Sequence, residues 1–217
     1  TEGLVGSEMC IRDSLLSGQD CSHLRDRVLL YFLCVLSNAY KYSKSGYIML
    51  NNIYVGWDSR EDIAYQVCEH SIKRRCAEYD GYVQPLKQSE LRDQRLYWRE
   101  PDKLGSTEFT ITRFLVPHLN NYEGWAVFCD CDMVWRTNPR ELWALKDDSK
   151  AVMVVKHQYD VEEGTKMDNQ AQLPYPRKNW SSMILWNCGH PKNKELSLET
   201  VNTASPRFLH RFEWLDD

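Results

Sequence analysis

The chain alternates short apolar runs with stretches whose apolar residues recur at helical spacing. The apolar runs predict buried strands at Ile53–Gly56, Trp125–Cys129, Ala151–Val155 and Met183–Trp186. A further run, Val83–Leu86, predicts a weak strand, because Pro85 lacks the N–H that a strand donates to its neighbour. Strands that alternate with helices are typical of α/β proteins, so we expect a mostly parallel sheet with helices on both faces.

Helix-start signals stand between these runs. Ser59 precedes Asp62 by three residues, the spacing of a capping box, and Ile63, Val67 and Ile72 follow near helical spacing. The other expected helices run from Ser106 or Thr107 to about Leu119, from Arg140 to Leu145 behind Asn138-Pro139, and from Ser205-Pro206 toward Trp214.

Length and charge narrow the class of protein. The 217 residues are 42% hydrophobic, which suits one sizeable core and a single main domain. The net charge of −4 provides no basic field that would attract nucleic acid, so we expect no nucleic-acid partner.

The N-terminal region stands apart from the rest. Its longest apolar run, Val28–Leu36, has nine residues, too few for the roughly 20 that span a bilayer, so membrane association is not expected from this chain. Because Gly3–Ser14 resembles non-native sequence, residues 1–48 are expected to be a non-native or disordered segment, and residues 49–217 the folded domain. The eight cysteines form no C-x-x-C pair. A disulfide framework is not expected in a chain this long, which favours a reducing compartment such as the cytoplasm. The secretory pathway is the alternative if Val28–Leu36 is a signal segment.

Two carboxylates, Asp130 and Asp132, directly follow the expected strand Trp125–Cys129. Side chains two apart on an extended segment project to one face, so this pair can share a cation while Cys129 and Cys131 point the other way. Oxygen ligands suit Mn²⁺ or Mg²⁺, hard cations that bridge to phosphates. Open α/β sheets bind ligands at the carboxyl ends of their strands. The pattern therefore predicts a cation site here, with a solvated loop as the plain alternative.

The segment Ser106–Trp135 resembles the GT-A glycosyltransferases of the glycogenin and bacterial galactosyltransferase type. Those proteins carry a helix with a basic residue, an apolar strand, D-x-D and further apolar residues. The family's first strand, its short helix after D-x-D and its strand that ends in Asn are similar to Ile53–Asp58, Pro139–Leu145 and Ser181–Asn187, respectively. The resemblance thus covers about Ile53 to Asp217. It implies a GT-A, Rossmann-like fold and a metal-dependent glycosyltransferase, a hexosyltransferase with a UDP-sugar as the favoured donor. The acceptor stays open among glycan, lipid and protein.

The resemblance also implies roles for single residues. The nucleotide pocket would be lined by Gly56, Trp57 and Asp58, with the Trp57 ring suited to stacking on a base. Arg113 would reach the diphosphate or the second carboxylate, and the donor sugar would lie beside Ser181 and Ser182. Asp130 and Asp132 would hold the cation, which stabilises the charge left on the departing diphosphate. The plain alternatives are a buried tryptophan at position 57, a helix-capping Asp58 and a surface Arg113.

Three departures from the family pattern bear on the mechanism. Trp180 stands where the family usually has Asn beside the donor sugar. The family's late acidic residue, near the reactive carbon of the sugar, finds its nearest match in Asp216 and Asp217, which are therefore the expected catalytic carboxylates. The family's distal His motif, a third metal ligand, has no counterpart, so the domain is expected to be incomplete at its C-terminus.

The long polar stretch Asp160–Trp180 is expected to be an acceptor loop, or else a plain surface loop.

Two other function classes fit parts of the sequence. The motif Asp130–Val134 also matches the first motif of haloacid dehalogenase-type phosphohydrolases, but those proteins carry it near the start of the fold and need a later acidic pair after a strand. Here two strands precede it, and Asp147-Asp148 lies before a strand. A non-catalytic nucleotide-sugar-binding pseudoenzyme keeps the same fold and pocket.

Overall fold

A computed structural model describes residues 52–76, 82–100, 106–156, 177 and 179–215, with the backbone of two short strands, β5 (Gly164–Thr165) and β6 (Ala171–Gln172). These residues belong to one compact unit, Ile48–Asp217. The N-terminal segment 1–48, most of the expected acceptor loop, and the carboxylates Asp216 and Asp217 lie outside the described residues.

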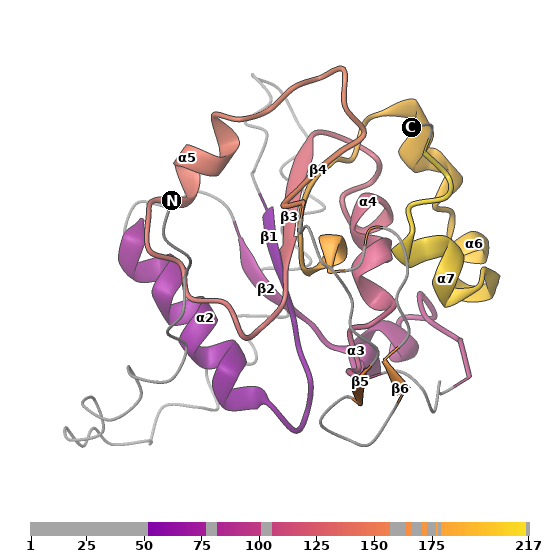
Figure 1. Ribbon diagram of the computed structural model, residues 1–217, viewed down its shortest axis with the longest axis horizontal. Coiled ribbons are helices and arrows are strands. Elements are labelled where there is room, and N and C mark those ends of the chain that lie inside the picture. Colours follow the sequence, from indigo (N-terminus) through magenta and orange to yellow (C-terminus); the bar gives the residue numbers. More distant parts are fainter. Residues whose placement is uncertain are drawn as a thin grey trace. The chain divides into compact units, whose positions relative to one another are not determined.

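The core is a five-stranded sheet in the order β2-β1-β3-β7-β4 (Figure 1). Its strands are β1 (Asn52–Gly56), β2 (Val83–Leu86), β3 (Trp125–Cys129), β4 (Val152–Val154) and β7 (Met183–Asn187). β1 pairs in parallel with β2 and β3, whereas β7 runs antiparallel to both of its neighbours, β3 and β4. All five expected strands form, and the α/β, mostly parallel sheet is confirmed. The weak strand β2 takes the edge, where Pro85 is tolerated.

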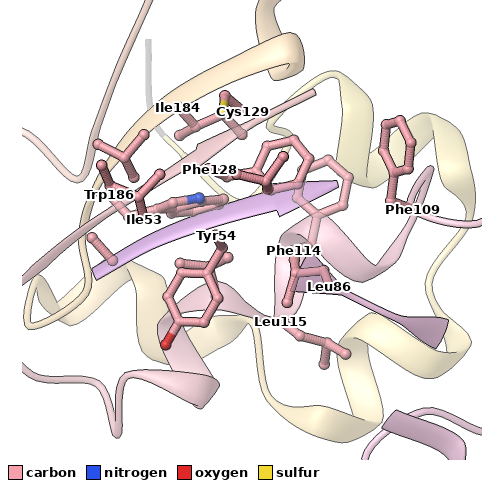
Figure 2. Packing of buried hydrophobic residues seen from close by; sticks show 14 of the residues in the cluster. Ile53, Tyr54, Leu86, Phe109, Phe114, Leu115, Phe128, Cys129, Ile184 and Trp186 are labelled. Atoms are coloured by element: carbon pink, nitrogen blue, oxygen red, sulfur yellow. The ribbon is translucent and has the colours of Figure 1, made fainter. Parts of the chain in front are cut away.

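Helices cover both faces of this sheet, as expected. On one face, α2 (Asp62–Arg75) brings the Cys68 sulfur to 3.9 Å from the Cys129 sulfur of β3. On the other face, the Phe114 ring stands edge-on to the Trp186 ring of β7, with centroids 6.4 Å apart. Phe114 belongs to a 3₁₀ turn, η1 (Thr112–Leu115), which continues into α4 (Val116–Leu119). Figure 2 shows Phe114, Cys129 and Trp186 among the buried side chains of this core.

The start of α2 differs from the prediction. The residue before the helix is Glu61, with no side-chain cap, and the Ser59 hydroxyl donates to Glu108 instead. Ile63 and Val67 are 69% and 43% exposed, while the helix buries Tyr65, Cys68, Ser71 and Ile72. The capping box was therefore assigned wrongly, because Ser59 is drawn to a turn that is distant in the sequence. Of the three apolar positions expected at helical spacing, Ile72 is buried but Ile63 and Val67 are not.

The single helix expected from Ser106 to Leu119 is also wrong. Residues 108–111 form turns, Thr107 pairs with Thr110 through their hydroxyls at 3.0 Å, and regular α-helix begins only at Val116. Pro117 lacks the N–H that a continuous helix would donate to the carbonyl of residue 113, so the α-helical ladder cannot pass through this point.

The remaining described helices are short, and two of them begin at the caps that the sequence predicts. The Asn138 side chain accepts from Arg140 N at the start of α5 (Pro139–Trp143), and Ser205 accepts from Phe208 N at the start of α7 (Pro206–His210), as the sequence signals predict. The others are α3 (Gln88–Asp93), η3 (Pro191–Glu195) and α6 (Leu198–Thr203). Among the described helices, none is long and apolar enough to cross a membrane.

Candidate active site

Three loops meet at one edge of the sheet. The parallel strands β1 and β3 end there, followed by Trp57 and by Asp130 respectively. Because β7 is antiparallel, it begins at the same edge, preceded by the 3₁₀ turn η2 (Trp180–Ser182). The backbone N–H of Asp130 donates to the carbonyl of Ser182 at 2.9 Å. The topology thus gathers residues from distant parts of the sequence around Asp130.

Asp130 forms an ion pair with Arg113. The Nη1 of Arg113 donates to Oδ1 of Asp130 at 2.9 Å, and the side chains are 7% and 22% exposed. Burial raises the pKa of Asp130 to about 6, with Arg113 acting in the opposite direction and the carboxylates of Asp132 and Glu61 adding to the rise. The three carboxylates thus concentrate negative charge at this edge of the sheet, and the buried Arg113 guanidinium offsets part of it.

Arg113 is held from several sides. Its Nε donates to the carbonyls of Phe109 and Thr110, and its Nη1 also donates to the carbonyl of Ser181 at 2.7 Å. The guanidinium lies over the ring of Phe128, 4.9 Å from its centroid. The surface-arginine alternative is therefore wrong, and the carboxylate that Arg113 reaches is the first of the pair, Asp130, rather than Asp132.

Asp132 is exposed, whereas the thiols of Cys129 and Cys131 are buried. Because β3 ends at Cys129 and residues 131–132 form a turn, the extended alternation expected through Asp132 does not continue past the strand. Cys131 is buried and donates to Oε2 of Glu61 at 3.5 Å. Burial, followed by the nearby Glu61 carboxylate, raises the pKa of Cys131 to about 12, so this thiol stays protonated. Glu61 was not predicted from the sequence; it stands just before α2, in the loop after β1, where a carboxylate can reach the end of β3.

The donor set suits a cation that is shared with a ligand. In the part of the chain that the structure describes, no group of three or more His, Cys, Asp or Glu side chains is arranged to hold a metal ion. Two carboxylates provide hard oxygen ligands, but a six-coordinate Mn²⁺ or Mg²⁺ needs further oxygens from phosphates or water. Among the described residues, Asp130 and Asp132 therefore fit a divalent cation that would also take oxygens from a diphosphate.

Trp57 follows β1 and is half-buried. Its indole N–H donates to Oδ1 of Asp62 at 2.8 Å, and the ammonium of Lys87 lies 5.2 Å from the ring centroid. Asp62, at the start of α2, therefore fixes the orientation of the ring. A base stacked on Trp57 has to use the ring face away from Lys87 or displace that side chain.

Asp58 is completely buried and serves the fold. Its carboxylate accepts from the N–H and the guanidinium of Arg60 and from the N–H of Glu108. The hydrogen bonds from Arg60, which outweigh burial, lower the pKa of Asp58 to about 2. Neither a ribose contact nor a helix cap describes this geometry: Asp58 ties the loop after β1 to the turn at residues 106–111.

Gly56 is required by a close approach of the Phe109 ring. A Cβ added at position 56 would lie 2.5 Å from Cδ2 of Phe109, well inside contact distance. The glycine thus lets Phe109 cover the end of β1, next to the ion pair of Arg113.

The two serines of η2 face different ways. The Ser181 hydroxyl is buried and lies 3.0 Å from Nδ1 of His210, whereas the Ser182 hydroxyl donates to the carbonyl of Asn179. Beside them, the half-buried Trp180 ring has Lys156 at 5.4 Å. His210 was not predicted; it lies on α7, and no local sequence signal connects it with Ser181.

Comparison with known proteins adds a close relative. No protein-family model matches the chain. It is 56% identical over 165 residues to "Protein CDI" of Arabidopsis thaliana, an alignment that covers 76% of this chain. The aligned part spans 63% of that relative, and its name states no activity.

Solved structures supply the fold. The structure of "WbbM bifunctional glycosyltransferase", in its apo form, matches with a TM-score of 0.51 and 13% identity, over 78% of this chain and 38% of that chain. Mouse xyloside xylosyltransferase 1, also apo, matches with a TM-score of 0.45 and 13% identity, over 74% of this chain and 77% of that chain, a likeness too distant to support an inference. With the sheet order described above, the first match shows that the chain has a GT-A glycosyltransferase-like fold.

Proposed function

We propose that this chain, with its GT-A glycosyltransferase-like fold, is the nucleotide-sugar-binding domain of a metal-dependent glycosyltransferase. The proposed reaction transfers a sugar, by family resemblance a hexose, from a nucleotide diphosphate to an acceptor that is a glycan, a lipid or a protein. Fold alone does not establish this function, since one fold supports many activities. The support comes from the residues at the carboxyl edge of the sheet.

One observation carries the proposal: Asp130 and Asp132 emerge from the end of β3, with Arg113 bonded to the first carboxylate. The ion pair and the hydrogen bond from Asp130 N to Ser182 hold the pair's first member in place, while Asp132 is exposed to an incoming ligand. When bound, Mn²⁺ or Mg²⁺ supplies the positive charge that stabilises the departing diphosphate.

The other residues have supporting roles in this proposal. Trp57 offers an aromatic face to the base, oriented by Asp62, and a uridine diphosphate is our preferred donor nucleotide on family resemblance. Gly56 and Asp58 shape the pocket without touching the ligand, because the first makes room for Phe109 and the second is buried under Arg60. Ser182 stands at the rim of the site, where we place the donor sugar.

The phosphohydrolase alternative gains nothing from the geometry. The later acidic pair, Asp147 and Asp148, precedes β4 and is engaged locally: Asp147 accepts from Ser149, and Asp148 accepts from the Trp125 indole. The pseudoenzyme alternative keeps the same binding site and differs only in turnover, so it is separated by experiment.

Binding is tested by thermal unfolding with uridine diphosphate and guanosine diphosphate, each with Mn²⁺, with Mg²⁺ and with a chelator. We expect stabilisation only when the cation is present, because a ligand that binds the native state raises the unfolding temperature by mass action. The variant Asp93→Asn, which removes one charge at the exposed end of α3, is the control and should behave like the wild type. Equal stabilisation with and without chelator would show that no cation bridges the nucleotide to the protein.

Turnover is tested on the full natural protein. It is incubated with Mn²⁺ and a panel of UDP-sugars, and the release of UDP is measured. Release that depends on Mn²⁺ and on an added acceptor supports the enzyme. Tight Mn²⁺-dependent binding without release under any acceptor would instead identify a nucleotide-sugar-binding pseudoenzyme.

A further inference from the structure

We propose that His210 is a positioning residue for the acidic site, acting through Ser181 on the pair Arg113–Asp130. The inference rests on the proposed function in one respect: it takes Asp130 to be a carboxylate that must be held in place for a cation. His210 comes from α7, far along the chain from Asp130, and reaches the site through hydrogen bonds that can be followed one by one.

The η2 turn is the element through which His210 acts. Two consecutive carbonyls of this turn face the site: that of Ser181 accepts from Nη1 of Arg113 at 2.7 Å, and that of Ser182 accepts from the N–H of Asp130 at 2.9 Å. The turn therefore holds both partners of the ion pair by their polar groups. A shift of its backbone would move the guanidinium and the carboxylate together.

The hydroxyls of both serines in this turn are hydrogen-bonded as well. From within, the Ser182 hydroxyl donates to the carbonyl of Asn179, a residue in the left-handed conformation with φ of 63°. From outside, Nδ1 of His210 lies 3.0 Å from the Ser181 hydroxyl, which is buried and thus shielded from competition by water. His210 thus ties the turn to α7, in addition to the bonds that its carbonyls accept from Arg113 and Asp130.

The His210 ring is itself held in one orientation. It packs edge-on against the ring of Phe114, with centroids 5.2 Å apart and an interplanar angle of 85°. Phe114 is fully buried and directly follows Arg113 in η1. The same imidazole thus contacts both segments that carry the ion pair, the 3₁₀ turn with Arg113 and the 3₁₀ turn with Ser181.

Replacements of His210 that keep or remove the hydrogen bond separate positioning from packing. In His210→Asn the side-chain amide stands near the place of Nδ1 and can still bond the Ser181 hydroxyl, whereas His210→Leu fills space without a polar atom. We expect His210→Leu to weaken Mn²⁺-dependent binding of uridine diphosphate by about tenfold, the scale of a lost outer-shell partner, and His210→Asn to restore most of it. Adding Ser181→Ala to His210→Leu should cause little further loss, because both changes break the same link. Calorimetric titration measures the affinity, and thermal unfolding of each variant measures the fold.

The outcomes separate this inference from the proposed function. If His210→Leu lowers the unfolding temperature but binds like the wild type, or if Asn and Leu weaken binding equally, His210 is a packing residue only. If the wild type itself does not bind Mn²⁺ and nucleotide, the proposed function is wrong, and the positioning is then tested without ligand. In ¹H–¹⁵N spectra of the metal-free protein, the backbone N–H of Asp130, which donates to the carbonyl of Ser182, should exchange with water faster in His210→Leu than in the wild type and His210→Asn. Unchanged exchange would refute the positioning role.

Discussion

At the scale of single residues, the site contains two kinds of carboxylate that the sequence cannot tell apart. Asp58 and Asp130 both follow a buried strand, yet Asp58 is fully buried under Arg60 whereas Asp130 remains 22% exposed beside Arg113. Their pKa values move in opposite directions, to about 2 and about 6, because hydrogen bonds dominate at Asp58 and burial dominates at Asp130. The first is a structural anion and the second a candidate ligand.

Asp132→Asn should abolish Mn²⁺-dependent nucleotide binding, whereas Ser182→Ala should leave it largely intact. Asn keeps the size of Asp but removes a negative charge from an exposed cation ligand, so we expect affinity to fall by about 100-fold or more. Ser182→Ala keeps the backbone carbonyl that accepts from Asp130 and loses only the hydroxyl bonded to Asn179. Titration of uridine diphosphate in Mn²⁺ against both variants measures this. Wild-type affinity in Asp132→Asn would remove Asp132 from the metal site.

Asp58→Asn should destabilise the fold in a pH-dependent way. The folded pKa of about 2 lies below the ordinary 3.8, so ionised Asp58 stabilises the native state fully above about pH 4, and the contribution is lost as the pH falls toward 2. The shift corresponds to stability on the order of 2 kcal/mol near neutral pH. Denaturant unfolding at several pH values should show the wild type and the variant converge between pH 4 and pH 2. A constant gap over that range would contradict this assignment.

At the scale of elements, α2 shows how the sheet decides which side of a helix is buried. Apolar residues occur on two sides of α2, and the sheet contacts the side of Tyr65, Cys68 and Ile72 while Ile63 and Val67 face outward. The α2 contacts with β1 and β2 and the Cys68–Cys129 contact with β3 leave no freedom for the other rotation. A weak difference between the two sides in the sequence becomes a definite orientation through packing.

Two isoleucines of α2 offer a matched pair for this orientation. Ile72 is 0% exposed and Ile63 is 69% exposed, so the same replacement meets opposite environments in one helix. Ile72→Ala should lower the free energy of unfolding by about 2–4 kcal/mol, since it leaves a cavity. Ile63→Ala should change it by less than about 0.5 kcal/mol. Chemical denaturation measures both; comparable losses would mean that the helix is rotated from the described position.

At the scale of the whole domain, one buried amide connects the sheet to the C-terminal segment. Nδ2 of Asn193 donates to the carbonyls of Ala151, before β4, and Asn187, at the end of β7, at 2.8 Å each. Its Oδ1 accepts from the Trp214 indole at 3.4 Å, and the Trp214 ring stacks on Trp186. Asn193 thus joins the start of β4 and the end of β7, the last two strands in the sheet order, to the turn that contains Trp214.

Asn193→Ala should therefore destabilise the domain as a unit. The change removes one hydrogen bond from each of the Ala151 and Asn187 carbonyls, which keep a backbone partner, and it leaves the Trp214 indole without this acceptor. A lost hydrogen bond costs about 1 kcal/mol, and a buried donor left unpaired costs about 1–3 kcal/mol. We expect a total loss of about 2–4 kcal/mol in the free energy of unfolding. Lys194→Ala, at an exposed position of the same 3₁₀ helix, is the control and should stay close to the wild type. Similar losses in both variants would point to the helix itself instead of the amide.

The sequence alone determined the parts of this protein that depend on local chemistry. Five apolar runs became the five strands of the main sheet, and the Asn138 and Ser205 caps formed as predicted, because buried strands and caps are set by residues adjacent in the chain. Tertiary structure decided the rest. The antiparallel insertion of β7 brought η2 to Asp130, distant partners redirected Ser59 and Asp58, and α7 delivered His210 to Ser181. Such contacts join residues that are far apart in the chain, and no local pattern encodes them.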